Sequence, residues 1–547
     1  MRESALLVWE GLYRQNTKTP HKQEGISDMK VSSSSRRSGG ASGARKRRRD
    51  KVASDARSLR RRLERAVGPN PDGPVLGRPN IAYELAERTR AVSHGGMGMV
   101  AKLVAALGVA DEIDASVHLL RAHRPYHESD HVLNVAYNAL CGGRTLDDIE
   151  ARRTDQVFLD GIGAAALPDP TTAGDFCRRF QPASVMALQD GINRARLRAW
   201  AAQPASFFER PAVIEADATI VPTGAQTKAG MDISYDGTWG YSALMVSLAN
   251  TKEPLFLALH GANRPSHEGV VPLYDKAVAL CRQAGFTDVM LRGDTDFSLT
   301  ANFDRWHANG VRFCFGYDAK ANLVEAASEL PERLYHELAA RADQAVVRRA
   351  RPHDHKDDVV RRRGFTTLRQ QREDLVSFSY RPTKCGRDYR IVALRKNLSV
   401  EKGHEVLFFD YRYFFYVTND WDMTDDEVVA QARRRCDQEN LIAQLKGQVR
   451  ALHAPVNTLV ANWAYMVMAA LAWSLKAWCA LLLPVSPRWA AKHAEEQRRL
   501  LRMDFRSFRS AFIELPCQIV KTARRVVWRV LAWSAWLGAF FRLVDVL

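Results

Sequence analysis

Val213-Ile214-Glu215-Ala216-Asp217-Ala218-Thr219 is the part of this chain from which its fold is best predicted. Its β-branched and small apolar residues favour an extended strand, on which side chains alternate between the two faces. Glu215 and Asp217 therefore share one face of the predicted strand. A second apolar run, Val289-Met290-Leu291-Arg292-Gly293, is followed directly by Asp294. Each run would deliver a carboxylate to the edge of a β-sheet.

The segments around these two runs predict a mixed sheet. Hydrophobic patterning predicts strands at 214–221, 242–248 and 255–259, a helix near 269–283, a strand at 289–291 and a helix near 299–308. This β-β-β-α-β-α order is that of an RNase H-like fold, in which three antiparallel strands are followed by parallel ones. The predicted fold class is therefore α/β, with a mixed five-stranded sheet flanked by helices.

A third acidic residue lies on a predicted long helix, 424–446. Arg435 and Lys446, at −4 and +7 from Glu439, fall within about 60° of it on a helix of 3.6 residues per turn. We expect Glu439 to bind a metal ion, and Arg435 and Lys446 to hold a DNA backbone. The alternative is a solvated helix whose charges form ordinary ion pairs.

Two strand carboxylates and one helix carboxylate can share a pair of divalent cations about 3.5–4 Å apart, which clamps both oxygens of a phosphoryl displacement. Asp217, Asp294 and Glu439 are accordingly the predicted catalytic residues and metal ligands. We expect their carboxylates to converge on one site.

The charge of the chain indicates a polyanionic partner. The 547 residues carry a formal net charge of +17 with a pI near 9.6, and residues 1–66 hold 18 Lys and Arg against 7 Asp and Glu. The eight cysteines include no CxxC pair, which argues against a disulfide scaffold and a structural zinc site. Low hydrophobicity and blocks of like charge predict disorder in residues 1–66.

Composition and patterning divide the chain into six predicted regions. They are a disordered basic tail and linker (1–79), a helical DNA-binding region (80–205), the first part of the catalytic core (206–310), a β-rich insertion (311–410), the second part of the core (411–484) and a C-terminal helical region (485–547). Within the second core part, 459–483 is nearly all apolar and long enough to cross a membrane. We expect a helix buried in a large protein instead, because three polar residues interrupt it.

One motif points to a different chemistry. His127-Glu128-Ser129-Asp130-His131 matches the HExxH pattern of zinc proteases. A zinc site would need both histidines on one helix face and a third ligand, for which Asp147 and Glu150 are candidates. A basic DNA-binding protein without catalysis is the other alternative.

The three acidic blocks together resemble the DDE transposases of bacterial insertion sequences. Arg435, Glu439 and Lys446 match the signature Tyr-x2-Arg-x3-Glu-x6-Lys, whereas Ala432 stands at the Tyr position. Asp217-Ala218-Thr219 resembles the first Asp block and Arg292-Gly293-Asp294 the second, which adds Arg292 to the predicted DNA contacts. Among such families, the insertion-sequence family numbered thirteen-eighty is the most similar.

This resemblance implies a cut-and-paste transposase with an RNase H-like core. It implies cleavage and strand transfer at terminal inverted repeats. The implied cofactor is a pair of Mg²⁺ or Mn²⁺ ions. The implied partners are double-stranded DNA, both transposon ends and target, and a second copy of the chain in a synaptic homodimer. The implied location is the bacterial cytoplasm, on the nucleoid when DNA is bound, without a membrane.

Overall fold

A computed structural model describes most of the chain, in two compact units, Met1–Gly73 and Pro74–Leu547. The described residues are 38–65, 90–123, 125–338, 362–367, 373–397, 400–402, 405–408, 411–434, 436–522, 525–531 and 533–547.

The first unit contains one long described helix, α2 (Ser38–Arg65). The prediction of disorder is wrong for this stretch. Arginine, leucine and alanine are good helix formers, and Lys51–Asp55 (2.5 Å) and Arg60–Glu64 (2.7 Å) pair across one turn. Residues 1–37 and 66–79 of the predicted tail and linker lie outside the described residues.

The second unit begins with a short strand and a group of helices, as predicted for a helical region at 80–205. These elements are β1 (Arg90–Val92), α3 (Met97–Ala106), α4 (Val109–Ser116), α5 (Glu128–Leu140), α6 (Glu150–Arg153), α7 (Gln156–Ile162), α8 (Pro170–Arg178) and α9 (Pro182–Ala201). The DNA-binding role of this region stays a prediction.

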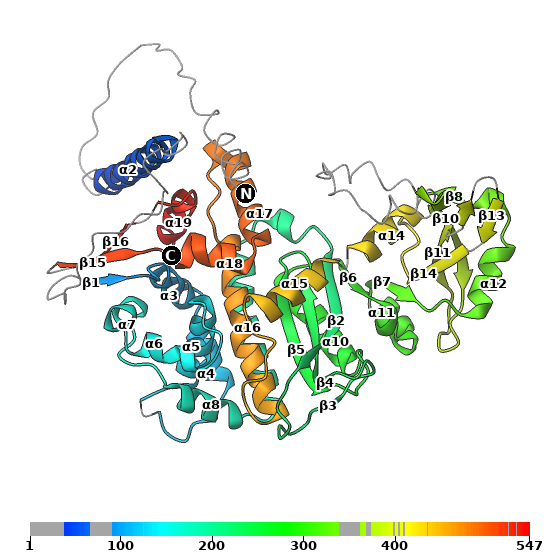
Figure 1. Cartoon of the computed structure of the whole chain (residues 1–547), viewed down its shortest axis with the longest axis horizontal. Helices are drawn as coiled ribbons and strands as arrows, with labels where there is room; N and C mark the ends of the chain where they lie inside the picture. Colours follow the sequence, from blue (N-terminus) through cyan, green and yellow to red (C-terminus); the bar gives the residue numbers. More distant parts are fainter. Residues whose placement is uncertain are drawn as a thin grey trace, which may run out of the picture. The chain divides into compact units, whose positions relative to one another are not determined.

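A large mixed sheet forms the centre of the second unit (Figure 1). Its first five strands are β2 (Ala212–Pro222), β4 (Trp239–Leu248), β5 (Glu253–Gly261), β6 (Val289–Gly293) and β7 (Val311–Tyr317). Their spatial order is β5-β4-β2-β6-β7, in which β4 is antiparallel to β5 and β2, and β2, β6 and β7 are parallel. The helices α10 (Val270–Ala284) and α11 (Phe303–Ala308) connect the parallel strands, and the two-residue strand β3 (Asp232–Ile233) pairs with β4.

The prediction of a five-stranded sheet is wrong, because the sheet does not end at β7. It continues through β14 (Tyr411–Thr418), β11 (Tyr389–Asn397), β10 (Glu373–Tyr380) and β8 (His336–Glu337), all antiparallel to their neighbours. The outer edge of β7 would otherwise expose unpaired backbone N–H and C=O groups, which β14 satisfies. The strands β9 (Phe365–Thr367), β12 (Val400–Lys402) and β13 (Glu405–Phe408) form a separate small sheet, and α12 (Ala321–Glu329) precedes them.

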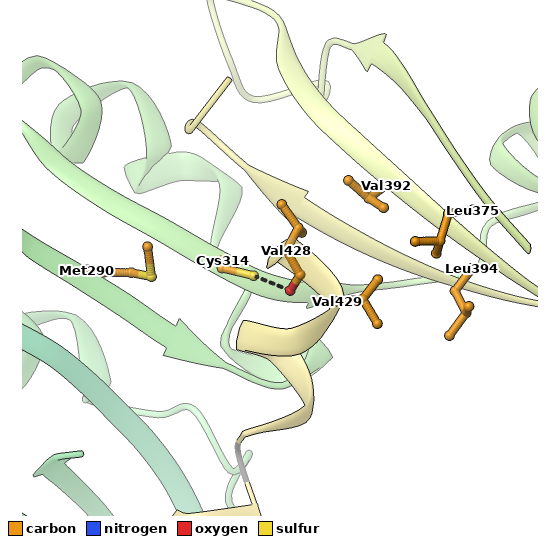
Figure 2. Packing of buried hydrophobic residues seen from close by; sticks show 7 residues of the cluster. All are labelled: Met290, Cys314, Leu375, Val392, Leu394, Val428 and Val429. Carbon is orange, nitrogen blue, oxygen red and sulfur yellow. Dashed lines mark hydrogen bonds between the residues drawn. The ribbon is translucent and has the colours of Figure 1, made fainter. Parts of the chain in front are cut away.

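The continuous helix predicted at 424–446 is instead two helices, α14 (Asp425–Arg433) and α15 (Cys436–Gly447). The capping box of Thr424 and Glu427 starts α14. Figure 2 shows Val428 and Val429 of α14 packed over the sheet, where the Cys314 Sγ–H donates to the Val428 carbonyl (3.6 Å). Because α14 packs on β7, β10, β11 and β14 while α15 packs on β2, the two segments follow different parts of a twisted sheet.

The apolar segment forms α16 (Leu459–Leu481), which packs against α5, α9 and β5. Among the described residues it is the one helix long and apolar enough to span a membrane, and its apolar window is wholly buried inside the protein. This confirms the predicted burial. Lys476 is accommodated because its Nζ donates to the Leu501 carbonyl (2.7 Å) and lies 4.1 Å from the centre of the Trp473 ring.

The last elements of the second unit form a smaller group, which pairs with the first strand of that unit. They are α17 (Ala490–Arg502), α18 (Phe505–Phe508), a π-helical turn (Arg509–Ile513), β15 (Cys517–Thr522), β16 (Arg525–Val530) and α19 (Leu537–Val544). β15 pairs with both β1 and β16, so the ends of the second unit share a three-stranded sheet.

Candidate active site

The pairing of β2 and β6 brings the first two predicted acidic residues to the same end of two neighbouring parallel strands. The last paired residues of these parallel strands are Glu215 and Arg292, and Asp217 and Asp294 each follow two positions later. Neighbouring strands lie about 4.8 Å apart, and residues two apart share a face. Asp217 therefore lies on the face of β2 that carries Glu215, and Asp294 directly follows the last residue of β6.

Local hydrogen bonds orient both aspartates. Asp217 Oδ1 accepts from the Ala218 N–H (2.8 Å). Asp294 caps the 3-10 turn Thr295–Phe297, where its Oδ1 accepts from the Asp296 N–H (2.9 Å). Both side chains are half-buried.

Tyr274 of α10 lies close to these carboxylates. Its hydroxyl donates to the Arg292 carbonyl (3.2 Å). Burial raises the pKa of Tyr274 well above its ordinary value, and the negative charges of Asp294, Glu215 and Asp217 raise it further. Negative charge is thus concentrated at this end of β2 and β6.

Glu439 reaches the same region from α15, which is fastened to the sheet along its length. The buried Gln438 accepts from the Ser247 hydroxyl and donates to the Met245 carbonyl (3.2 Å) on β4. Asp437 pairs with Lys252 (2.8 Å). These contacts fix the first turn of α15 and leave the neighbouring Glu439 exposed.

An open cleft of about 670 Å³ joins Asp294 and Glu439, which both line it. One wall is formed by consecutive residues of β14, which include Arg412, Phe414 and Tyr416. The cleft therefore combines acidic groups with an aromatic and basic wall, a surface suited to a nucleic-acid strand.

Arg292 does not face this cleft, so its prediction as a DNA contact is wrong. Its guanidinium is buried and donates to Glu215 Oε1 from Nε (2.8 Å) and Nη2 (2.5 Å), and to the Gln431 carbonyl and Oε1 from Nη1 (3.0 and 2.9 Å). Burial raises the pKa of Glu215 to about 7, against the opposing effect of Arg292. Glu215 is the buried ion-pair partner of Arg292, and the hydrogen bonds of Arg292 to Glu215 and Gln431 hold α14 against β2 and β6.

Lys446 faces the site from the last turn of α15. Its Nζ donates to the Ile220 carbonyl on β2 (2.7 Å). Burial lowers the pKa of Lys446, and the negative charge of Asp217 partly opposes that change. Lys446 thus lies near Asp217 rather than on a solvated helix surface. Arg435, the other predicted cation, lies outside the described residues.

The donor set at the cleft fits a hard divalent cation, because carboxylate oxygens are the ligands that Mg²⁺ and Mn²⁺ prefer. Within the described ranges, however, no group of three or more His, Cys, Asp or Glu side chains is placed to hold a metal ion. The structure places Asp217 on β2, Asp294 directly after the neighbouring strand β6, and Glu439 on the cleft that Asp294 lines. The convergence of all three carboxylates stays a prediction.

The HExxH residues have structural contacts that conflict with a zinc site. Glu128 is buried and its carboxylate accepts from the Leu119 and Leu120 N–H groups (both 2.9 Å). His131 is stacked on Phe176, with ring centres 4.2 Å apart, and burial lowers its pKa to about 4. The motif therefore fastens the loop before α5 and packs the helical region.

Sequence reasoning missed Tyr274, Gln438 and the cleft wall on β14. The signal in the sequence for this wall was the run of aromatic residues from Tyr411 to Tyr416, which favours a strand. Nothing local distinguished Tyr274 or Gln438 from other residues of amphipathic helices, because their partners are distant in the sequence.

The sequence profile of the family described as "Transposase DDE domain group 1" matches residues 83–544. The chain belongs to this family. Membership in the Transposase DDE domain group 1 family supports a transposase function, with the nuclease and strand-transferase activity general to such domains. It is consistent with the mixed α/β architecture of the second unit.

A solved structure of a piggyBac transposase synaptic complex with hairpin DNA is similar at 10% sequence identity and a TM-score of 0.31, covering 77% of this chain and 81% of that chain. Comparison with curated proteins gave no match.

Proposed function

We propose that this protein is a cut-and-paste transposase of a bacterial insertion sequence related to family thirteen-eighty, built on an RNase H-like core. It would bind terminal inverted repeats, cleave the DNA there and join the freed ends to target DNA. The observation that carries the proposal is the placement of Asp217 on β2 and of Asp294 directly after the parallel strand β6, with Glu439 on the cleft that Asp294 lines. The strand order β5-β4-β2-β6-β7 supports the RNase H-like assignment.

The reaction consists of two phosphoryl displacements. In the first, water attacks phosphorus and the P–O3′ bond breaks, which leaves a 3′-OH and a 5′-phosphate. In the second, that 3′-OH attacks a phosphorus of the target DNA, a new P–O bond forms, and a target 3′-OH leaves. Neither step changes an oxidation state.

Asp217, Asp294 and Glu439 would hold two ions of Mg²⁺ or Mn²⁺. Such ions, when bound, stabilise the negative charge on attacking and leaving oxygens. The protein's own contribution is positioning. The contacts of Gln438 hold α15 on β4, and Lys446 places a positive charge close to Asp217. Arg412 on the cleft wall is exposed and would bind a phosphate of the DNA strand.

The proposed biological unit is a homodimer that holds both transposon ends, in the bacterial cytoplasm and on the nucleoid when DNA is bound. No contact with a membrane is proposed.

The test uses the full chain and a labelled duplex that contains the DNA flanking its gene, where paired inverted repeats are expected. With Mg²⁺ the protein should nick the repeat ends, and chelation should stop nicking. Asp217→Asn, Asp294→Asn and Glu439→Gln should each lower the cleavage rate about 10³-fold, since the transition-state stabilisation at stake is about 4 kcal/mol. DNA affinity should stay within about threefold, because the phosphate contacts that dominate affinity are retained.

Asp296→Asn is a matched control. Asp296 is an exposed carboxylate two residues from Asp294 and accepts from the Ser266 hydroxyl (2.6 Å), so its loss should leave cleavage intact. Metal-independent binding without nicking would instead favour a DNA-binding protein that lacks catalysis.

A further inference from the structure

The C-terminal helix α17 has one packed face and one basic face. On the packed side, His493 and Leu500 are buried, and Gln497 Nε2 donates to the Leu481 carbonyl (3.0 Å). Glu496 pairs with Arg542 of α19. These contacts fix the rotation of α17 about its own axis.

The opposite side of α17 presents Lys492, Glu495, Arg499 and Arg502, spaced by three, four and three residues along one helical face. Glu495 is neutralised by Arg498 (2.8 Å). All five side chains are exposed. The helix therefore holds a stripe of positive charge in a fixed orientation.

A cleft of about 380 Å³ lies along this stripe. Arg499 and Arg502 line it together with Trp536, and the Arg499 guanidinium carbon lies 5.5 Å from the centre of the Trp536 ring. Neither arginine forms an ion pair with any residue in the part of the chain that the structure describes. Their charge remains available to an anion.

This cleft is connected directly to the helix that carries Glu439. Gln444 Nε2 donates to Asp504 Oδ1, and the Phe505 N–H donates to Gln444 Oε1 (both 3.1 Å). Asp504 lines the basic cleft. Gln444 is five residues beyond Glu439, a distance of about 7.5 Å along the axis of α15. Figure 1 shows α15, α17 and α18 in the same part of the second unit.

We propose that the α17 stripe and its cleft bind the phosphodiester backbone of duplex DNA, and so form part of the DNA path beside the active site. This inference rests on the proposed function. From Lys492 to Arg502 the stripe extends about 15 Å along the helix axis. A DNA duplex carries about one charge per 1.7 Å of its axis when both strands are counted, so a duplex segment of this length carries about nine phosphate charges. Contacts to phosphate do not read sequence, so the stripe would add affinity and orientation rather than recognition of the repeats.

The experiment measures DNA affinity of the full chain against salt concentration, with the flanking-DNA duplex and an unrelated duplex of equal length. Arg499→Ala/Arg502→Ala should reduce the slope of log K against log salt by about 1.8, since each phosphate contact contributes about 0.9. Between 50 and 200 mM salt, the wild-type affinity should therefore fall about 12-fold more than that of the variant. The effect should be equal on both duplexes.

Two other double variants separate this role from general effects of charge. Arg305→Ala/Arg381→Ala removes the same net charge from exposed arginines that pair with Asp275 and Asp388, and should leave the slope unchanged. Arg499→Lys/Arg502→Lys should keep most of the slope, because the charge is retained. Thermal unfolding of each variant verifies that it is folded.

An unchanged slope in folded Arg499→Ala/Arg502→Ala would overturn the inference, as would an equal loss in the Arg305→Ala/Arg381→Ala control. A change in self-association without a change in DNA affinity would also overturn it and assign the stripe to contact with another copy. The proposed function is judged separately, by whether the wild-type chain cleaves the flanking-DNA duplex. Cleavage with an unchanged slope rejects only the role of α17.

Discussion

Arg292→Ala distinguishes a structural role of this residue from the DNA contact that its position beside Asp294 suggested. The substitution removes two hydrogen bonds to Glu215 and two to Gln431. It leaves the Glu215 carboxylate, which is 2% exposed, without its cation. Breaking a buried pair by removal of one partner costs about 3–5 kcal/mol.

This cost predicts a measurable fall in thermal stability. Unfolding entropy near 2.1 cal/mol/K per residue gives about 1 kcal/mol/K for a unit of roughly 470 residues that unfolds cooperatively. The melting temperature should therefore fall by about 3–5 °C. The fall should be smaller at pH 6 than at pH 8.5, because the pKa of Glu215 is raised and protonation at acidic pH removes the unpaired charge.

The assay combines thermal unfolding with DNA affinity measured well below the melting temperature. DNA affinity should match that of the wild type. Arg292→Met/Glu215→Leu should recover most of the lost stability, since an apolar replacement of a buried ion pair is often neutral. An Arg292→Ala protein with wild-type stability and reduced DNA affinity would refute this reasoning and restore Arg292 as a DNA contact.

Three further predictions follow from buried polar groups. Gln438→Ala should lower the cleavage rate more than the DNA affinity, both measured on the same duplex, because α15 loses its contacts to Ser247 and the Met245 carbonyl. Equal cleavage rates in the variant and the wild type would show that these contacts do not position Glu439. The pKa of His131 is lowered from 6.5 to about 4, so the stability that its neutral form contributes is present above pH 6.5 and is lost as the pH falls towards 4. In thermal unfolding between pH 6.5 and pH 4, the melting temperature of His131→Phe should fall less than that of the wild type. Identical pH profiles of the two proteins would contradict this prediction. Burial lowers the pKa of Lys476 to about 7, so the wild-type protein should lose stability as the pH falls from 10 to 7. This loss should be smaller in Lys476→Met, and parallel plots of stability against pH for the two proteins would contradict the prediction.

The amino-acid sequence by itself determined the local elements with strong patterns. The apolar runs before Asp217 and Asp294 predicted β2 and β6, and the length and composition of 459–483 predicted α16. These predictions succeeded because strand alternation and apolar burial depend on residues close together in the chain. Family resemblance at the three acidic blocks indicated the transposase family, which the match over residues 83–544 established.

The tertiary structure alone decided which side chains meet. The pairing of β2 with β6 brings Asp217 and Asp294 to the same end of the two strands, and Glu215 pairs with Arg292, which lies 77 residues away in the sequence. The same is true of the break between α14 and α15 and of the sheet that continues from β7 to β14. These features depend on backbone pairing and burial between distant segments, which override local propensity. The residues next to a carboxylate, an arginine or a helix end in the sequence do not identify the distant residue that will neutralise or bury it.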